Sequence, residues 1–463
     1  MKLRTKYVMM VVICCFILRL VFFLLVHPWT PESQNQRVLQ GDALGYHHLA
    51  ITLLESHRFA YGSAREPETI RTPLFPLYIS TVYWLFGTKP WIVILGQIIL
   101  NTISCLLILL LFAQHFGARI AVISSIFFAL EPLNILFSCS LYSEVFFVFF
   151  LVAAFYVFGQ SIKAETGNKA FVLYAVSGIL MGLATLARPI TVYFPLVVII
   201  ILFVNYRTQV LRATQYAITY LLFFILTLSP WLIRNHGISG RYSVTSHGSQ
   251  TILVAAAYME ADKRHKDVDT VQQELKLEAD QMMVADGLRP QDVNPFVKSK
   301  YWQKLGMRYI KADPVDFGRK YLFGVAHIFT NLGTSLFARM LGMPIMKLDI
   351  KSYANIKDLL RAFFKEKGGF DLLVAAIIVP FLLVCYLAMA VGLLVSWGRF
   401  HQGFLLFCLL SAMYFVMIAG IIGFARYKLP AIPFYLPFVG IGFDHVLRKV
   451  GILKVSDKAQ TEP

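Results

Sequence analysis

Residues 7–26, YVMMVVICCFILRLVFFLLV, form an apolar run of twenty residues behind a basic start, MKLRTK. A helix of that length crosses a hydrocarbon core about 30 Å thick. The alternative is a secretory signal peptide. The run is too long for the apolar part of a signal peptide, however, and the following HPWTPES has no small-x-small cleavage site. We therefore interpret residues 7–26 as a retained membrane span.

The composition indicates a membrane protein throughout. The 463 residues are 57% hydrophobic and 15% charged, and a soluble domain with that balance would expose large apolar patches. The net charge of +17 does not indicate nucleic-acid binding, because lysine and arginine lie mostly between apolar runs, where they orient helices and meet anionic headgroups. The sequence predicts an all-α polytopic protein with one integral membrane domain over residues 1–463. Membrane lipids are its expected surroundings.

The apolar runs predict about ten transmembrane helices. Their approximate bounds are 7–26, 91–112, 119–136, 141–159, 170–187, 190–205, 214–233, 371–396, 403–423 and 429–446. With the N-terminus in the cytoplasm, the short cytoplasmic segments hold 13 lysines and arginines and the short external turns hold three. This difference agrees with the positive-inside rule.

Two longer regions then lie outside the membrane, residues 27–90 and 234–370. Residues 74–87 are too short to span comfortably and predict a helix in the membrane interface. Residues 317–340 predict either an interfacial helix or a further pair of spans, which would bring the total to twelve. The six cysteines lie in or beside apolar runs without metal-ligand spacing, so we expect them to be small core residues.

Four arginines lie where this topology does not explain them. They are Arg71, Arg188, Arg234 and Arg426. All four fall at the external membrane surface, where short bacterial loops are normally poor in arginine. Each could be a snorkelling residue anchored by aromatic neighbours. Guanidinium groups also bind phosphate bidentately, so four at one depth favour an anion site suited to a lipid phosphate. Arg19, in the first span, is expected to point to the same level.

Two acids fall near this level, Glu131 in FFALEPLNILF and Glu144 in SLYSEVFFVFF. A charged side chain at a helix centre costs about 2.5–3.5 kcal/mol, so such residues usually face a cavity or a partner. Glu144 is therefore expected either to pair with one of the arginines or to contact the substrate.

A third acid, Asp42, begins the segment DALGYHHLAITLLES in the first external region. The apolar residues that follow at helical spacing form a stripe suited to the membrane surface: Tyr46, Leu49, Ala50, Leu53 and Leu54. Asp42 could be the helix N-cap, although Gly45 stands where a capping box has Glu or Gln. A carboxylate beside arginines also suits glycosyl transfer, because the acid can deprotonate an acceptor hydroxyl while arginine stabilises a departing lipid phosphate.

Several segments, taken in order, resemble the GT-C glycosyltransferases. They are GDALGYHHLA, RTPLFPLYISTVYWLFG, SLYSEVFFVFF, GLATLARPITVYFP, SPWLIRNHGISGRYSVTSHGS, YWQKLGMRYIKADPVDFGRKYLF and ARYKLPAIPF. The set covers most of the chain. It is most similar to the bacterial branch that includes protein O-mannosyltransferases and lipid A aminoarabinose transferases.

The resemblance implies a GT-C fold with external juxtamembrane helices, and transfer of a sugar from a polyprenyl-phosphate donor with inversion. It implies that Asp42 is the catalytic base, that Arg71 precedes the juxtamembrane helix, and that Arg188, Arg234 and Arg426 bind the donor phosphate.

Tyr46, Glu144 and Tyr427 complete the expected substrate-binding residues. The acceptor hydroxyl would belong to a lipid, a glycan or a protein. No cofactor and no metal are expected, since no second acid cluster with ligand spacing accompanies Asp42 in its loop, although a divalent metal stays an alternative.

We therefore expect an enzyme of the bacterial inner membrane whose active site faces the periplasm. The competing class is a transporter or flippase for an anionic lipid-linked substrate, which would also use arginines at one level. The sequence shows none of the repeated halves that are usual in transporters. A scaffold of an envelope assembly would account for the topology but not for the arginines.

Overall fold

Long apolar helices form the body of the protein. The computed structural model describes residues 4–61, 67–164, 167–344 and 369–451, in which no β-strand forms. Eight helices in these residues are long and apolar enough to cross a membrane. They are α1 (Thr5–Val26), α5 (Pro90–Phe116), α8 (Ser143–Lys163), α9 (Asn168–Ala187), α11 (Val210–Ser239), α18 (Gly369–Val395), α19 with η4 (Gln402–Ala419, Gly420–Ile422) and η5 with α20 (Ala425–Ala431, Ile432–Lys449). The predicted all-α polytopic fold is confirmed.

The predicted span 119–136 is a bent pair of helices. α6 (Ala118–Leu130) and α7 (Pro132–Ser138) meet at 58°. The bend lies at Glu131, whose backbone is extended because a residue before proline disfavours the helical conformation. The Glu131 carboxylate then accepts a hydrogen bond of 2.6 Å from the backbone N–H of Asn134, which caps α7. Counted as one span, the pair would be the ninth.

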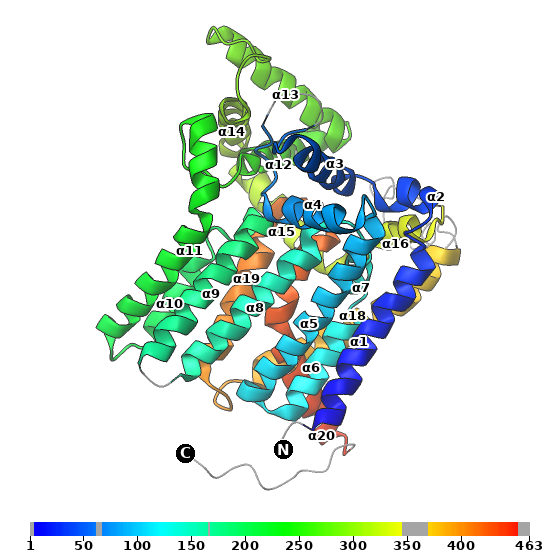
Figure 1. Cartoon of the computed structure of the whole chain (residues 1–463), viewed down its shortest axis with the longest axis vertical. Helices are drawn as coiled ribbons and strands as arrows, with labels where there is room; N and C mark the ends of the chain where they lie inside the picture. Colours follow the sequence, from blue (N-terminus) through cyan, green and yellow to red (C-terminus); the bar gives the residue numbers. More distant parts are fainter. Residues whose placement is uncertain (1–3, 62–66, 165–166, 345–368, 452–463) are drawn as a thin grey trace.

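The predicted span 190–205 is also interrupted. A 3-10 turn, η2 (Pro189–Thr191), precedes α10 (Pro195–Asn205), whose 11 residues are too few to cross a bilayer as a helix. Proline begins both elements, so the chain restarts its helix inside the apolar run. The segment nevertheless carries the chain back from the end of α9 to the start of α11 (Figure 1).

Short helices cover one end of the bundle, which we call the covered end (Figure 1). They are α2 (Pro31–Ser33), the π-helical turn η1 (Gln34–Val38), α3 (Asp42–Ser56), α4 (Leu74–Phe86), α12 (His247–Arg264), α13 (Val268–Ala285), α14 (Pro295–Ala312), α15 (Pro314–Thr330) and α16 (Thr334–Leu341). α1 begins and α20 ends at the opposite, open end (Figure 1).

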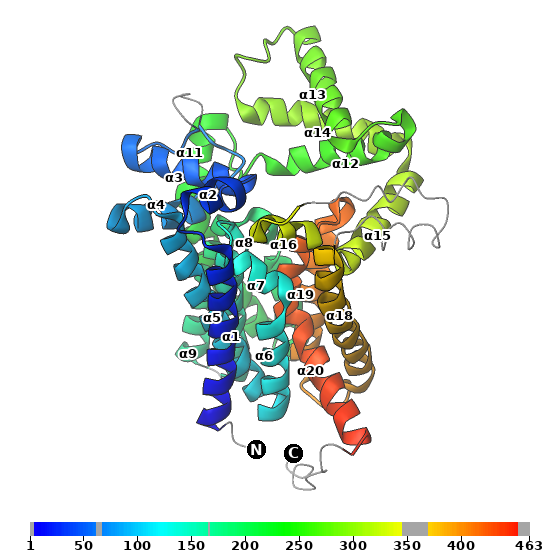
Figure 2. The ribbon, with the colours of Figure 1, turned by 90° about the vertical axis from the view of Figure 1, so that its right-hand side faces the viewer.

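The two ambiguous segments are now assigned. Residues 74–87 form α4, which lies across the covered end as predicted (Figure 1). Residues 317–340 form two helices, α15 and α16, and neither is among the helices fit to span a membrane, so the further pair of spans is wrong. Figure 2 shows α15 descending from the upper helices towards α18 and α19. Within the two predicted external regions, residues 62–66 and 345–368 lie outside the described residues.

The apolar stripe of α3 is partly buried within the protein. Leu49 and Ala50 are fully buried, because α3 packs on α4. At this seam the ring of Tyr46 meets Phe75 edge-on at 4.9 Å between centroids. α4 thus lies under part of the α3 stripe, while the start of α3 reaches the bundle through Tyr46, whose hydroxyl lies 3.1 Å from Ser143 Oγ.

His47 makes the α3–α4 seam sensitive to pH. Its ring Nδ1 lies 2.8 Å from the hydroxyl of Tyr83, and burial, helped by the charge of His48, lowers the pKa of His47 to about 4. Its pKa in an unfolded chain is about 6.5, so the unfolded state binds more protons between these values and stability falls as the pH drops from about 6.5 to 4. We expect His47→Asn to flatten this part of the profile of thermal midpoint against pH. His57→Asn, at an exposed site just after α3, should not change the profile.

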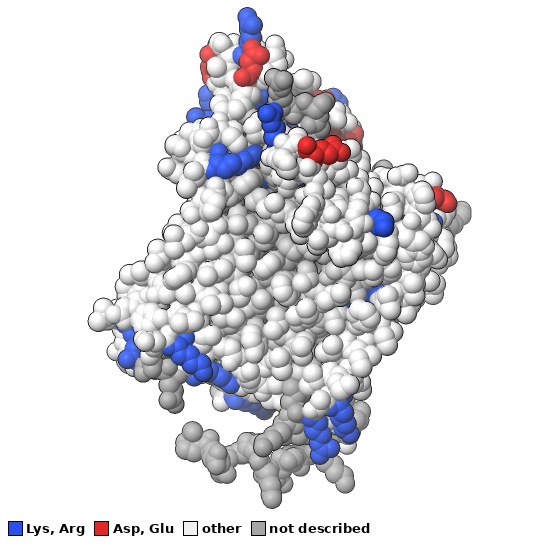
Figure 3. Space-filling view, in the orientation of Figure 1, with Lys and Arg blue, Asp and Glu red and all other residues white. Residues whose placement is uncertain are grey.

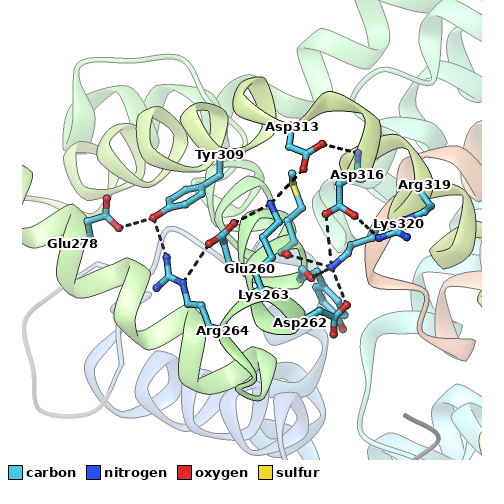
Figure 4. A network of polar contacts seen from close by, with 12 residues as sticks. Glu260, Asp262, Lys263, Arg264, Glu278, Tyr309, Asp313, Asp316, Arg319 and Lys320 are labelled. Carbon is cyan, nitrogen blue, oxygen red and sulfur yellow. Dashed lines mark hydrogen bonds and ion pairs between the residues drawn. The ribbon is translucent and has the colours of Figure 1, made fainter. Parts of the chain in front are cut away.

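The helices α12, α13 and α14 have a hydrophobic core of their own. Leu253, Leu275 and Leu305, one from each helix, are fully buried together. Figure 4 shows the charged network around this core. Its contacts include Arg264 to the Tyr309 hydroxyl at 3.0 Å and Lys320 to Asp262 at 3.0 Å. These contacts join α12 to α14 and to α15.

Arg19 lies inside the bundle and not at the covered surface, so that expectation was wrong. It is fully buried and donates hydrogen bonds to Asn101 Oδ1 (2.6 Å) and to the carbonyl oxygens of Cys15 (2.9 Å) and Ala129 (3.1 Å). The last carbonyls of a helix lack intrahelical donors, and the break at Glu131 exposes those of α6 inside the bundle. Arg19 satisfies them and joins α1 to α6.

We predict that Arg19→Met destabilises the bundle. Methionine fills much of the space but leaves the Ala129 carbonyl and one Asn101 lone pair without a donor, at about 1–3 kcal/mol for each buried group. The apparent thermal midpoint in detergent should fall by several degrees. Arg207→Met, at an exposed site, is the matched control. Equal midpoints for the two variants would show that Arg19 does not hold α1 in place.

Candidate active site

Asp42 begins α3 but does not cap it, so the N-cap alternative is not supported. The N-cap is Gly41, whose φ of 59° suits glycine. The Asp42 carboxylate points instead to two arginines. Its Oδ1 lies 3.2 Å from Arg71 and its Oδ2 lies 2.8 Å from Arg426. The positive end of the α3 dipole also favours a negative charge at this position.

Arg71 is held from the side of the first external region. Glu68 lies 3.6 Å from its guanidinium and accepts hydrogen bonds from the backbone N–H groups of Ile70 (2.5 Å) and Arg71 (3.2 Å). The Tyr61 hydroxyl accepts a hydrogen bond from the same guanidinium, which also lies 5.2 Å from the ring centre of Tyr46. Arg71 is therefore oriented by several neighbours as well as by Asp42.

Glu144, in the first turn of α8, pairs with an arginine, which was one of its two expected roles. Its carboxylate is 2% exposed and lies 2.5 Å from Arg188 and 3.8 Å from Arg426. Arg188, just after α9, also donates to Ser143 Oγ at 3.4 Å, and that hydroxyl lies 3.1 Å from the hydroxyl of Tyr46. Direct contact between Glu144 and a substrate stays a prediction.

Arg426 connects the two halves of the site because it contacts both Asp42 and Glu144. It lies on the 3-10 segment η5, with its guanidinium 5.3 Å from the ring centre of Tyr427. Two residues further on, the buried Lys428 lies 3.1 Å from Glu131. This ion pair fixes η5 against the start of α7 and explains the acid in the third predicted span.

Together these residues form one cluster of three arginines and three carboxylates, which we call the arginine–carboxylate cluster. Its members are Arg71, Arg188, Arg426, Asp42, Glu68 and Glu144. Their formal charges cancel. The carboxylates differ in access to solvent: Asp42 is 42% exposed, whereas Glu68 and Glu144 are 4% and 2% exposed.

The cluster keeps Asp42 ionised. Burial, the largest single influence, would raise the pKa of its carboxyl group, but the positive charges of Arg426, Arg71 and Arg188 outweigh burial and lower the pKa below its usual value. The carboxylate is therefore negatively charged at neutral pH, as a proton acceptor must be.

Arg234 is not brought to the cluster. Its guanidinium donates to the carbonyl oxygens of Glu68 (2.9 Å) and Phe59 (3.2 Å) and lies 4.4 Å from the ring centre of Trp231. These contacts attach the end of α11 to the loop that carries Glu68. Among the predicted site residues, the structure thus brings together Asp42, Arg71, Arg188, Arg426, Tyr46, Glu144 and Tyr427 and leaves Arg234 apart.

A histidine that our sequence reasoning missed lies beside the cluster. Ser246 N–H donates to the Thr69 carbonyl (3.0 Å) and Thr245 Oγ1 donates to the Ile70 carbonyl (2.6 Å), so the start of α12 is attached next to Arg71. His247 follows at an exposed position, and partial desolvation by the surrounding protein together with the charges of Arg188 and Arg426 lowers its pKa. Its only signal in the sequence was its place in the motif SPWLIRNHGISGRYSVTSHGS.

Within the described ranges, no three His, Cys, Asp or Glu side chains lie close enough to hold a metal ion. The six cysteines are free thiols, and all but Cys14 are buried.

Comparison with known proteins finds a family model that matches part of the chain and solved structures with a similar fold. The family model described as dolichyl-phosphate-mannose-protein mannosyltransferase matches residues 70–233. That segment includes Arg71, Glu144 and Arg188, whereas Asp42 and Arg426 lie outside it. A search of curated proteins finds no match.

Three solved structures match the chain, and the first two have a similar fold. The oligosaccharyltransferase of Archaeoglobus fulgidus in its apo form matches with a TM-score of 0.55 and 14% identity, over 97% of this chain and 51% of that chain. AglB of the same organism, in complex with an inhibitory peptide and a dolichol-phosphate, matches with a TM-score of 0.50 and 15% identity, over 95% and 51%. ArnT of Cupriavidus metallidurans, bound to undecaprenyl phosphate, matches with a TM-score of 0.43 and 12% identity, over 97% and 80%.

The architecture is that of a polytopic membrane protein whose charged site lies under short helices at one end. The GT-C resemblance seen in the sequence is confirmed, and the chain has the GT-C fold. It spans about half the length of the archaeal enzymes that it matches.

Proposed function

We propose that this protein is a membrane glycosyltransferase that moves a sugar from a polyprenyl-phosphate donor to a hydroxyl acceptor. The observation that carries the proposal is the Asp42 carboxylate, 42% exposed and held 3.2 and 2.8 Å from two arginines. This arrangement supports a role for Asp42 as proton acceptor and for the two arginines as phosphate-binding groups. The matched family description names a dolichyl-phosphate-linked sugar, and the archaeal AglB structure contains a dolichol-phosphate.

In the proposed reaction the lipid tail of the donor lies among the helices and its phosphate lies against Arg71, Arg188 and Arg426. Asp42 takes the proton of the acceptor hydroxyl while that oxygen forms a bond to the anomeric carbon. The bond from this carbon to the phosphate oxygen breaks, and its electron pair leaves with the lipid phosphate, whose charge the arginines stabilise. Attack from the face opposite the leaving group inverts the anomeric centre, through a transition state with oxocarbenium character.

The covered end would face the periplasm of a bacterial cell. On the face seen in Figure 3, the lysines and arginines drawn lie at both ends, while the acidic side chains drawn appear only at the covered end. This distribution supports an open end in the cytoplasm by the positive-inside rule. The acceptor would be a lipid, a glycan or a protein that reaches Asp42 from the side of α12.

The test uses purified protein in detergent with a panel of radiolabelled polyprenyl-phosphate sugars and membrane extract as the source of acceptors. We expect one sugar to leave its lipid, with release of free polyprenyl phosphate and labelling of an acceptor. A preparation carrying Asp42→Asn controls for contaminating transferases. Donor binding with no release under these conditions would favour the transporter or flippase.

A further inference from the structure

The arginine–carboxylate cluster is already neutralised by its own acids. Asp42 occupies Arg71 and Arg426, Glu144 occupies Arg188, and Glu68 lies 3.6 Å from Arg71. Three positive and three negative charges leave no net attraction for an added anion. A donor phosphate therefore gains its strongest ion pairs here when one carboxylate gives up its arginines.

Only one of the three acids is placed to do so. Glu144 and Glu68 are 2% and 4% exposed, and a buried carboxylate that lost its partner would be left as an uncompensated charge, at a cost of several kcal/mol. Glu68 is fixed further by the two backbone N–H groups that it accepts. Asp42 is 42% exposed, so water can solvate its carboxylate when the arginines turn away.

We infer that Asp42 is the resident anion of the phosphate site, and that a lipid phosphate binds by displacing its carboxylate from Arg71 and Arg426. This inference rests on the proposed function and adds to it an order of events. In the empty site the arginines suppress the basicity of Asp42. The donor phosphate takes the arginines over, which frees the carboxylate as a base only when there is a donor to attack.

The groups that face Asp42 are consistent with this exchange. From the elements around it, the charged and titratable neighbours are Arg71, Arg188, Arg426, Glu68, Glu144, Tyr46, Tyr61, Tyr142 and His247. The positive charges among them that touch its carboxylate are the two arginines in question. If the two arginines turn to a phosphate, Asp42 loses two neighbouring cations and gains a neighbouring anion. Each of these changes favours the protonated form of the Asp42 carboxyl group.

The experiment compares binding of undecaprenyl phosphate to wild type and to Asp42→Asn at pH 7.5 in detergent, without any sugar donor or acceptor. Removing the competing charge should lower the dissociation constant about tenfold. Glu55→Gln removes an exposed acid from the same helix and should bind as the wild type does. Arg71→Gln should bind more weakly, which shows that the probe occupies the cluster.

Equal or weaker binding by Asp42→Asn, including no binding by any of the proteins, overturns the inference. This readout does not need turnover, so it fails separately from the proposed transferase. Where turnover is found, a second measurement applies. The pH at which kcat falls on the acid side reports Asp42 in the enzyme with donor bound, and the same pH for kcat/KM reports Asp42 in the free enzyme. The midpoint for kcat should therefore lie about one pH unit above the midpoint for kcat/KM. Coincident limbs would also overturn the exchange.

Discussion

Asparagine in place of Asp42 should lower the rate of sugar transfer by about 10²–10⁴-fold, the usual contribution of a general base. The amide keeps the size of the carboxylate and can still accept a hydrogen bond from Arg426, but it cannot take up the acceptor proton. Because Asp42 is 42% exposed, we expect little change in stability. The measurement is kcat for release of polyprenyl phosphate at saturating donor, together with the thermal midpoint.

Glu55→Gln is the matched control, since it removes one negative charge from an exposed position of the same helix and should retain full activity. If Asp42→Asn retains more than about a tenth of the wild-type kcat while folding normally, Asp42 is not the base and another group must take the proton.

Arg426→Gln should lower kcat by about 10²–10³-fold, the range found when one donor to a developing negative charge is removed. Arg426 alone among the described arginines contacts both Asp42 and Glu144, at 2.8 and 3.8 Å. Its loss removes stabilisation of the departing phosphate. Glu144 keeps Arg188 at 2.5 Å, so the fold of the site should survive.

To separate a catalytic role from a structural one, the change in kcat is compared with the change in the affinity for donor. Arg58→Gln, just after α3 and exposed, controls for the loss of a positive charge at this end of the molecule. Unchanged kcat with a weaker affinity would assign Arg426 to ground-state binding alone. A fall in thermal midpoint equal to that of Arg19→Met would assign it to the fold.

The helical bundle could be predicted from the sequence because a membrane span needs a continuous apolar run, which sequence alone reveals. The two misjudged spans show the limit of that rule. Residues 119–136 are mostly apolar, yet Pro132 disfavours a helical conformation at Glu131, where the helix bends. The packing of α3 on α4 could not be predicted either, because an apolar stripe has the same sequence pattern whether it contacts lipid or another helix.

The site was predictable where a charge conflicted with its surroundings. Asp42, Arg71, Arg188, Arg426 and Glu144 each stood out against an apolar or external-surface context, and the structure brings all five together. Arg234 stood out in the same way but binds backbone carbonyls instead. Glu68 and His247 were missed because acids and histidines are common in polar loops, and only the fold shows that these two lie at the site.

Arg19 has a consequence for biosynthesis. During membrane insertion α1 emerges first, whereas Asn101 and Ala129, which receive its hydrogen bonds, are synthesised some time later. Until then the guanidinium has only the Cys15 carbonyl of its own helix. An arginine near a helix centre opposes insertion by about 2.5–3.5 kcal/mol, while each Leu, Ile, Phe or Val favours it by about 0.3–0.6 kcal/mol. The 14 such residues of Thr5–Val26 outweigh that cost. The guanidinium of α1 thus reaches its final contacts only after α5 and α6 have been made.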